Sequence, residues 1–302
     1  MLTVQNLRKE YKDLVAVRDI SFTVDRGKIF GLIGPNGAGK TTTIRAILNI
    51  IKPTSGSIRF DGKDVSPHFY NVVGYLPEER GLYKKSKVID VIKYFAQLKG
   101  LSANASIQRA KEWLQQLNIS GLKDKRIEEL SKGNQQKIQF ICSVIHNPQL
   151  LILDEPFSGF DPINQQQIKD LLLSFISSGM IIILSTHQMD TAEKLCSEIL
   201  LIDKGKDVCS GSLASIKKSF AENHVKIGFE GNPELIRSLP GIKQLDVYSN
   251  YAEIKLESEV APSEFLKLLV NRISITHFSI LEPTLNQIFI DVVNRAKTGE
   301  VK

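Results

Sequence analysis

The sequence has 302 residues, of which 42% are apolar and 24% charged, and its net charge is +6. These values are typical of a folded globular protein, and the length allows two domains of about 150 residues each. The longest apolar runs, 150–153 and 180–184, are far shorter than the roughly 18 residues that cross a bilayer, which excludes a membrane channel formed by this chain. The start lacks the apolar core of a signal peptide and the cysteines are scattered, so we expect a cytoplasmic protein. The positive charge forms no Lys/Arg block, and we interpret it as solvated surface rather than a nucleic-acid site.

Two strands are expected before residue 25. Residues 2–7 alternate weakly and predict an edge strand, and apolar positions from Val15 to Val24 predict a second strand before a turn. Tyr11 lies between them. Its ring could fold over a bound base and stack on it, but a plain surface tyrosine is an equally good interpretation of these residues alone.

The segment 34–41 has the spacing of a phosphate-binding loop, glycine, four residues and then Gly-Lys-Thr. An apolar run at 29–33 predicts a buried strand before it, and helical spacing over 42–51 predicts a helix after it. Glycines let successive backbone N–H groups point at phosphate oxygens, and the helix N-terminus adds to that attraction. The alternative is a glycine-rich turn before an ordinary helix. It is disfavoured because it would not require both a buried strand before the loop and a helix after it. The nucleotide-binding residues predicted here are Gly34, Pro35, Asn36, Gly37, Ala38, Gly39, Lys40, Thr41 and Thr42.

A helical insertion is expected over about 85–147. It follows a short strand at 72–76 and a charged loop that contains Glu78. Apolar positions at helical spacing predict helices over 88–98 and 110–117, and a further helix opens near Ser131 and continues to Ile145. Ser131 could cap that helix, and Gly133 would leave its first N–H groups accessible to an anion. Read alone this is a weak signal, because many helices begin in this way.

Residues 150–153 predict a central buried strand, and Asp154 and Glu155 follow at its carboxyl end. Ligands bind at that end of open α/β sheets. Asp154 would hold Mg²⁺ and Glu155 would polarise a water. The alternative, a strand that merely ends in an acidic turn, is disfavoured because a phosphate loop needs an acidic partner for Mg²⁺. Another buried strand at 180–184 is followed by His187, which could donate a hydrogen bond to a γ-phosphate or serve only a structural purpose.

The pattern changes near residue 223. Alternating segments at 225–229, 245–248 and 252–256, a helix at 263–270, a strand at 273–280 and a last helix at 284–295 predict a small α+β unit without a catalytic constellation. We therefore expect two domains, residues 1–220 and residues 221–302.

Taken together, residues 1 to about 220 resemble the ATP-binding subunits of ABC transporters. Residues 34–41 match Walker A, Asp154 and Glu155 match Walker B with its catalytic glutamate, and residues 130–134 match the signature sequence. Tyr11 matches the adenine-stacking aromatic, residues 158–161 the D-loop and His187 the switch histidine. The signature sequence closely upstream of Walker B makes the match specific.

The resemblance implies a P-loop α/β core with an antiparallel β subdomain, a helical subdomain and an accessory C-terminal domain. It also implies ATP and Mg²⁺ as cofactors, with Thr41, Glu78 and Asp154 at the metal and Lys40, Glu155 and His187 in catalysis. ATP would be held between two chains, identical or not, because the signature of one chain serves the nucleotide of the other through Ser131 and Gly133.

The chain departs from the family pattern at two places. Its signature has Lys132 and Asn134 where Gly and Gln are usual. Glu78 stands where the family usually has Gln, and we expect its carboxylate to tighten the requirement for Mg²⁺.

A separate integral membrane permease must form the translocation path, with this chain bound at the cytoplasmic face of the membrane. Leu82, Tyr83 and Phe95 are candidates to contact that partner, and core packing is an equal explanation for Phe95. The C-terminal part, including 281–289, is similar to the tail domain of ATPases that serve ABC-2-type exporters, among them sodium-export ATPases of the NatA type. There are two alternatives. The first, a soluble ABC protein that acts on ribosomes or DNA, is disfavoured because the chain has one cassette and no sustained heptads. The second, a regulatory nucleotide-binding module, is disfavoured because Glu155 and His187 are both present.

Overall fold

The computed structural model describes residues 1–66, 69–79, 81–220, 224–257, 259–270 and 272–298. The chain divides into two compact units, Met1–Ser212 and Leu213–Lys302. None of the helices in the described part is both long enough and apolar enough to cross a membrane.

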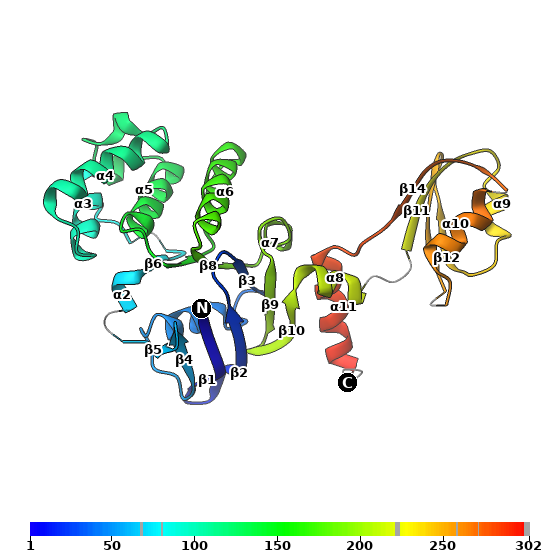
Figure 1. The fold of residues 1–302 in the computed structure, drawn as a ribbon, viewed down its shortest axis with the longest axis horizontal. Helices are drawn as coiled ribbons and strands as arrows, with labels where there is room; N and C mark the ends of the chain where they lie inside the picture. Colours follow the sequence, from blue (N-terminus) through cyan, green and yellow to red (C-terminus); the bar gives the residue numbers. More distant parts are fainter. Residues whose placement is uncertain (67–68, 80, 221–223, 258, 271, 299–302) are drawn as a thin grey trace. The chain divides into compact units, whose positions relative to one another are not determined.

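A six-stranded sheet forms the centre of the first unit (Figure 1). Its strands run in the order β10 (Lys206–Ser212), β9 (Glu198–Asp203), β3 (Ile29–Ile33), β8 (Ile181–Thr186), β7 (Leu150–Asp154) and β6 (Val73–Leu76). All pair in parallel except β10, which is antiparallel to β9. Strands β3, β7 and β8 are buried at every position, which explains their unbroken apolar runs. Their carboxyl ends carry the phosphate loop, Asp154 and His187.

A second, antiparallel sheet has the order β2 (Leu14–Val24), β1 (Leu2–Tyr11), β4 (Ser55–Phe60) and β5 (Lys63–Asp64). One apolar core joins residues of this sheet to α1 (Lys40–Ile47) and to β3, β7, β8 and β9. The expected edge strand at 2–7 is wrong: β1 pairs with β2 on one side and β4 on the other. Its weak alternation results from register shifts within both pairings, which interrupt the period of two.

The first unit contains further helices, among them those of the expected insertion. Within that insertion, α3 packs against both α4 and α5. The bounds of all these helices are as follows: α2 (Phe69–Val72), α3 (Val88–Leu98), α4 (Ala103–Gln116), the short 3₁₀ turns η1 (Ser120–Leu122) and η2 (Ile127–Glu129), α5 (Lys132–Val144), α6 (Pro162–Ser177) and α7 (Met189–Leu195). In Figure 1, α3, α4 and α5 gather together, and the antiparallel sheet lies on the opposite side of the strands of the central sheet.

The second unit contains a four-stranded antiparallel sheet in the order β12-β13-β11-β14. Its elements are α8 (Leu213–Phe220), β11 (His224–Glu230), α9 (Glu234–Arg237), β12 (Ile242–Val247), β13 (Tyr251–Leu256), α10 (Pro262–Val270), β14 (Ser274–Ile280) and α11 (Leu285–Thr298). The unit begins at Leu213 rather than at the expected residue 221, which itself lies outside the described residues, because α8 contacts α11 of the same unit.

Candidate nucleotide site

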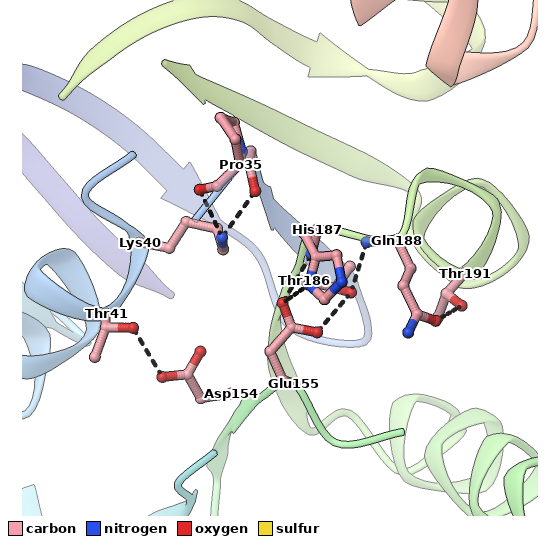
Figure 2. A network of polar contacts seen from close by, with 10 residues as sticks. Pro35, Lys40, Thr41, Asp154, Glu155, Thr186, His187, Gln188 and Thr191 are labelled. Atoms are coloured by element: carbon pink, nitrogen blue, oxygen red, sulfur yellow. Dashed lines mark hydrogen bonds and ion pairs between the residues drawn. The ribbon is translucent and has the colours of Figure 1, made fainter. Parts of the chain in front are cut away.

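The phosphate loop folds tightly against the N-terminal hairpin. Gly39 has φ +111°, and a Cβ at this position would lie 2.5 Å from the Ala16 carbonyl oxygen, so only glycine fits here. The loop leads directly into α1, whose first residue is Lys40. The ammonium of Lys40 is buried and donates to the carbonyls of Gly34 at 2.7 Å and Pro35 at 3.1 Å (Figure 2). Burial lowers the pKa of Lys40, and the negative charges of Glu155, Asp154 and Glu78 partly oppose that change.

Asp154 ends β7 beside the start of α1. The hydroxyl of Thr41 donates to Oδ2 of Asp154 at 3.2 Å. Burial raises the pKa of Asp154, and the hydrogen bond from Thr41 works in the opposite direction. Glu78 is exposed and lines the same cavity as these two residues. The three predicted metal residues therefore meet there, and their hard oxygen atoms are the donors that Mg²⁺ prefers.

Glu155 follows in a left-handed conformation, with φ +49°. Its buried carboxylate accepts three contacts from the end of β8 (Figure 2): Oε1 from the backbone N–H of His187 at 2.8 Å and from His187 Nδ1 at 2.6 Å, and Oε2 from the hydroxyl of Thr186 at 3.2 Å. Because an ionised carboxylate only accepts, the short contact places the imidazole proton on Nδ1. His187 and Glu155, which the sequence predicts as the switch histidine and the catalytic glutamate, are therefore directly paired.

A cavity of about 780 Å³ opens over the phosphate loop. Its lining residues are Leu14, Val15, Ala16, Arg18, Asn36, Gly37, Gly39, Lys40, Thr41, Thr42, Glu78, Asp154, Glu155, Lys204 and Gly205. Of the predicted loop residues, Gly34, Pro35 and Ala38 do not line the cavity. The carbonyls of Gly34 and Pro35 instead accept hydrogen bonds from the Lys40 ammonium. The pocket thus combines predicted loop residues with a wall from β2 and from the β9–β10 turn.

Sequence reasoning missed that second wall. Gly205 donates its N–H to the Ala38 carbonyl at 2.8 Å and accepts from the N–H of Arg18 at 2.7 Å, so the β9–β10 turn closes against both the loop and β2. Arg18 and Lys204 thereby bring two further cations to the cavity. No local motif marks them, because residues 18 and 204 belong to different sheets and meet only where the β9–β10 turn packs against β2. Thr186 was also missed, although its place directly before His187 was a usable signal.

Three predicted nucleotide contacts lie away from this cavity. Tyr11 is 44% exposed, does not line the cavity, and has the Lys9 ammonium 4.9 Å from its ring centre. Ser131 caps α5 by accepting from the N–H of Asn134 at 3.3 Å, and neither it nor Gly133 lines the cavity. The base-stacking role of Tyr11 stays a prediction, and so does the role of the signature.

Comparison with known proteins decides the family. A model described as "ABC transporter" matches residues 17–158, and one for the C-terminal domain of "ATP-binding protein DrrA1-3-like" proteins matches residues 211–293. The chain is 42% identical over 293 residues to the uncharacterized ABC transporter ATP-binding protein YhaQ of Bacillus subtilis, covering 97% of this chain and 98% of that one. The chain belongs to the ATP-binding subunits of ABC transporters. It is therefore an ATPase of the ATP-binding-cassette type.

Further relatives agree with that assignment. The chain is 35% identical to the Nod factor export ATP-binding protein I of Cupriavidus metallidurans, over 70% of this chain and 71% of that one. A solved structure of an ATP-binding subunit of an ABC transporter superposes with a TM-score of 0.68 at 31% identity, over 73% of this chain and 93% of that one. This ABC ATPase thus shares both sequence and cassette fold with its relatives.

Proposed function

We propose that this ABC ATPase powers export through a separate membrane permease. The relative that carries the words "Nod factor export" in its name supports the direction of transport. The observation that carries the proposal is the convergence of Lys40, Thr41, Asp154 and Glu155 at one cavity, with His187 hydrogen-bonded to Glu155.

The residues of the cavity divide the work of hydrolysis. Glu155 orients and deprotonates the attacking water. Lys40 stabilises charge on the transferred phosphoryl group. His187, which pairs with Glu155 through Nδ1, adds to that stabilisation.

Thr41, Asp154 and Glu78 would hold Mg²⁺ together with the phosphates. When bound, the ion would neutralise charge on the phosphate oxygens. Among the described residues no three His, Cys, Asp or Glu side chains form a metal cluster by themselves. This agrees with a site that the nucleotide completes.

The working unit is a pair of cassettes with ATP between them. Ser131 and Gly133 lie outside the cavity of their own chain, and they sit at the N-terminus of α5, where backbone N–H groups attract an anion. In the pair, these residues of one chain face the phosphates held by Lys40 of the other. Closing of the pair on ATP and release after hydrolysis supply the work. The second cassette is an identical or a related chain.

The permease binds at an aromatic patch beside the Glu78 loop. Tyr83 and Tyr94 are 54% and 44% exposed, and their ring centres are 5.6 Å apart, with Phe95 next to both. Such rings suit a helix that brings an apolar side chain and a polar backbone end. Leu82, expected to contact the partner, is only 9% exposed and belongs to the core. The contact keeps the chain at the cytoplasmic face of the membrane as a peripheral subunit.

Glu155→Gln tests the role of Glu155 as the general base. We expect the variant to bind ATP and accumulate as an ATP-bound dimer, with phosphate release slowed by about 100-fold or more because the general base is lost. Size-exclusion chromatography with Mg-ATP and a phosphate-release assay measure the two effects. Glu112→Gln, which removes an equal charge from the outer surface of α4, should turn over normally. Normal turnover by Glu155→Gln would remove Glu155 from this role.

A further inference from the structure

A buried glutamine of α5 holds the loop that carries Glu78. Gln139 is 5% exposed, and its amide nitrogen donates to the carbonyl oxygens of Pro77 at 3.3 Å and Glu79 at 3.0 Å. These two carbonyls stand on either side of Glu78. One amide group therefore fixes the backbone before and after the acid that lines the nucleotide cavity.

The orientation of this amide is determined by its neighbours. Both contacts are carbonyl oxygens, which only accept, so the nitrogen and not the oxygen of Gln139 must face them. The remaining amide oxygen is buried, and within the described residues it has no hydrogen-bond partner. An unpartnered buried acceptor destabilises a fold, and an apolar side chain of equal size would avoid it. The benefit of the amide must therefore lie in the loop that it holds.

Helix α5 packs along β6 and along the Glu78 loop, which continues from the end of β6. Near its end, Nε2 of His146 lies 3.0 Å from the Val73 carbonyl oxygen. One turn earlier, the backbone of Ser143 lies so close to Gly74 that a Cβ on Gly74 would collide with its carbonyl oxygen. Gln139 comes one further turn toward the N-terminus. The helix is thus attached to the strand and then to the loop, in steps of one turn.

The same helix reaches the two other functional segments. Its N-terminus at Ser131 lies eight residues, or about 12 Å of helix, before Gln139. Gln136, which is 2% exposed, donates to the carbonyl of Pro156, directly after Glu155. Helix α5 therefore makes side-chain hydrogen bonds to the backbone beside both Glu78 and Glu155.

We propose that Gln139 is a positioning residue that acts through Glu78. By fixing the carbonyls of Pro77 and Glu79, it holds the Glu78 carboxylate at the cavity, where the carboxylate binds the magnesium of Mg-ATP. The proposal rests on the metal role of Glu78 put forward above.

A double-mutant cycle in the full-length chain tests this. The Mg²⁺ concentration that gives half-maximal binding of a fluorescent, non-hydrolysable ATP analogue, and with it that for ATPase activity at fixed ATP, is measured for the wild type, Gln139→Met, Glu78→Gln and the double variant. We expect each single variant to raise it by about 10-fold, as loss of a metal ligand's support does. The double variant should match Glu78→Gln, because Gln139 has no other route to the metal.

Two controls separate positioning from stability. Ser143→Ala removes a buried hydroxyl of the same helix that donates to the Phe140 carbonyl and, in the described part of the chain, to no residue of the Glu78 loop, and it should leave the Mg²⁺ dependence unchanged. Gln139→Asn keeps the amide but shortens its reach, and it should reproduce Gln139→Met even if the latter folds poorly. Thermal unfolding of each variant checks the fold.

The outcomes distinguish the two ideas. If Glu78→Gln raises the Mg²⁺ requirement but the Gln139 variants do not, or if the effects of the two sites multiply, the positioning role is overturned and the metal role of Glu78 stands. If Glu78→Gln leaves the requirement unchanged, the metal role of Glu78 is wrong and the proposal for Gln139 falls with it.

Discussion

The Glu155 carboxylate owes its orientation to neighbours rather than to its own backbone position. Both of its oxygens accept hydrogen bonds from residues 186 and 187. Thr186 is 2% exposed, and its hydroxyl also accepts from the N–H of Gln188 at 3.0 Å, which fixes the hydroxyl between the two segments. We therefore assign Thr186 to positioning of the acid.

Thr186→Val tests that assignment, because valine keeps the shape and removes the hydroxyl. A hydrogen bond to a charged group contributes about 1.5–3 kcal/mol, so we expect kcat to fall by about 10-fold or more while ATP affinity changes little. Steady-state kinetics and nucleotide titration measure both quantities. Thr191→Val is the matched control, since the Thr191 hydroxyl donates to the Gln188 side chain and not to Glu155. Equal kinetics in the two variants would contradict the assignment.

At the scale of elements, the contact between β6 and α5 is as close as two backbones allow. Gly74 on β6 has no space for a Cβ beside the Ser143 carbonyl oxygen. His146 at the end of the helix adds to this contact, and burial lowers its pKa to about 4, so the ring stays neutral at physiological pH. The strand and helix therefore form one packed body.

Gly74→Ala should separate these two elements. Overpacking of this kind costs about 1–3 kcal/mol, which corresponds to a melting temperature lower by about 3–10 °C for a unit of this size. Differential scanning calorimetry of the full chain measures the change. Gly121→Ala, where a Cβ meets nothing within 4 Å, should leave the melting temperature nearly unchanged. A Gly74→Ala variant as stable as the Gly121→Ala variant would show that the two backbones separate at no cost.

At the scale of the whole molecule, the composite site predicts complementation between defective chains. Lys40→Ala and Ser131→Arg each spoil both sites of a symmetric dimer, so each variant alone should be nearly inactive. A mixture forms dimers in which one site combines an intact Lys40 with an intact Ser131, and we expect about a quarter of the wild-type ATPase rate if the sites act independently. A phosphate-release assay on the mixed chains measures this. Activity that stays at the level of the separate variants would argue that each chain works by itself.

The local parts of the site could be predicted because each is a continuous run with its own physical requirement. Residues 34–41 need glycines to expose N–H groups, and Asp154 and Glu155 follow four buried apolar residues, so the strand and its acidic end are both visible in the sequence. The proximity of Glu155 and His187 could also be predicted, because these residues come directly after two strands that pair in parallel.

Contacts between distant segments could not be predicted in the same way. Arg18 and Lys204 line the cavity because the β9–β10 turn closes on β2, and Gln139 reaches Pro77 and Glu79 because α5 packs along β6. The interior position of β1 and the burial of Leu82 likewise depend on which element packs on the other side. Local patterns decide which backbone shapes and chemical groups are present, but only tertiary packing decides which of them become neighbours, since that depends on long-range burial that no short window of sequence contains.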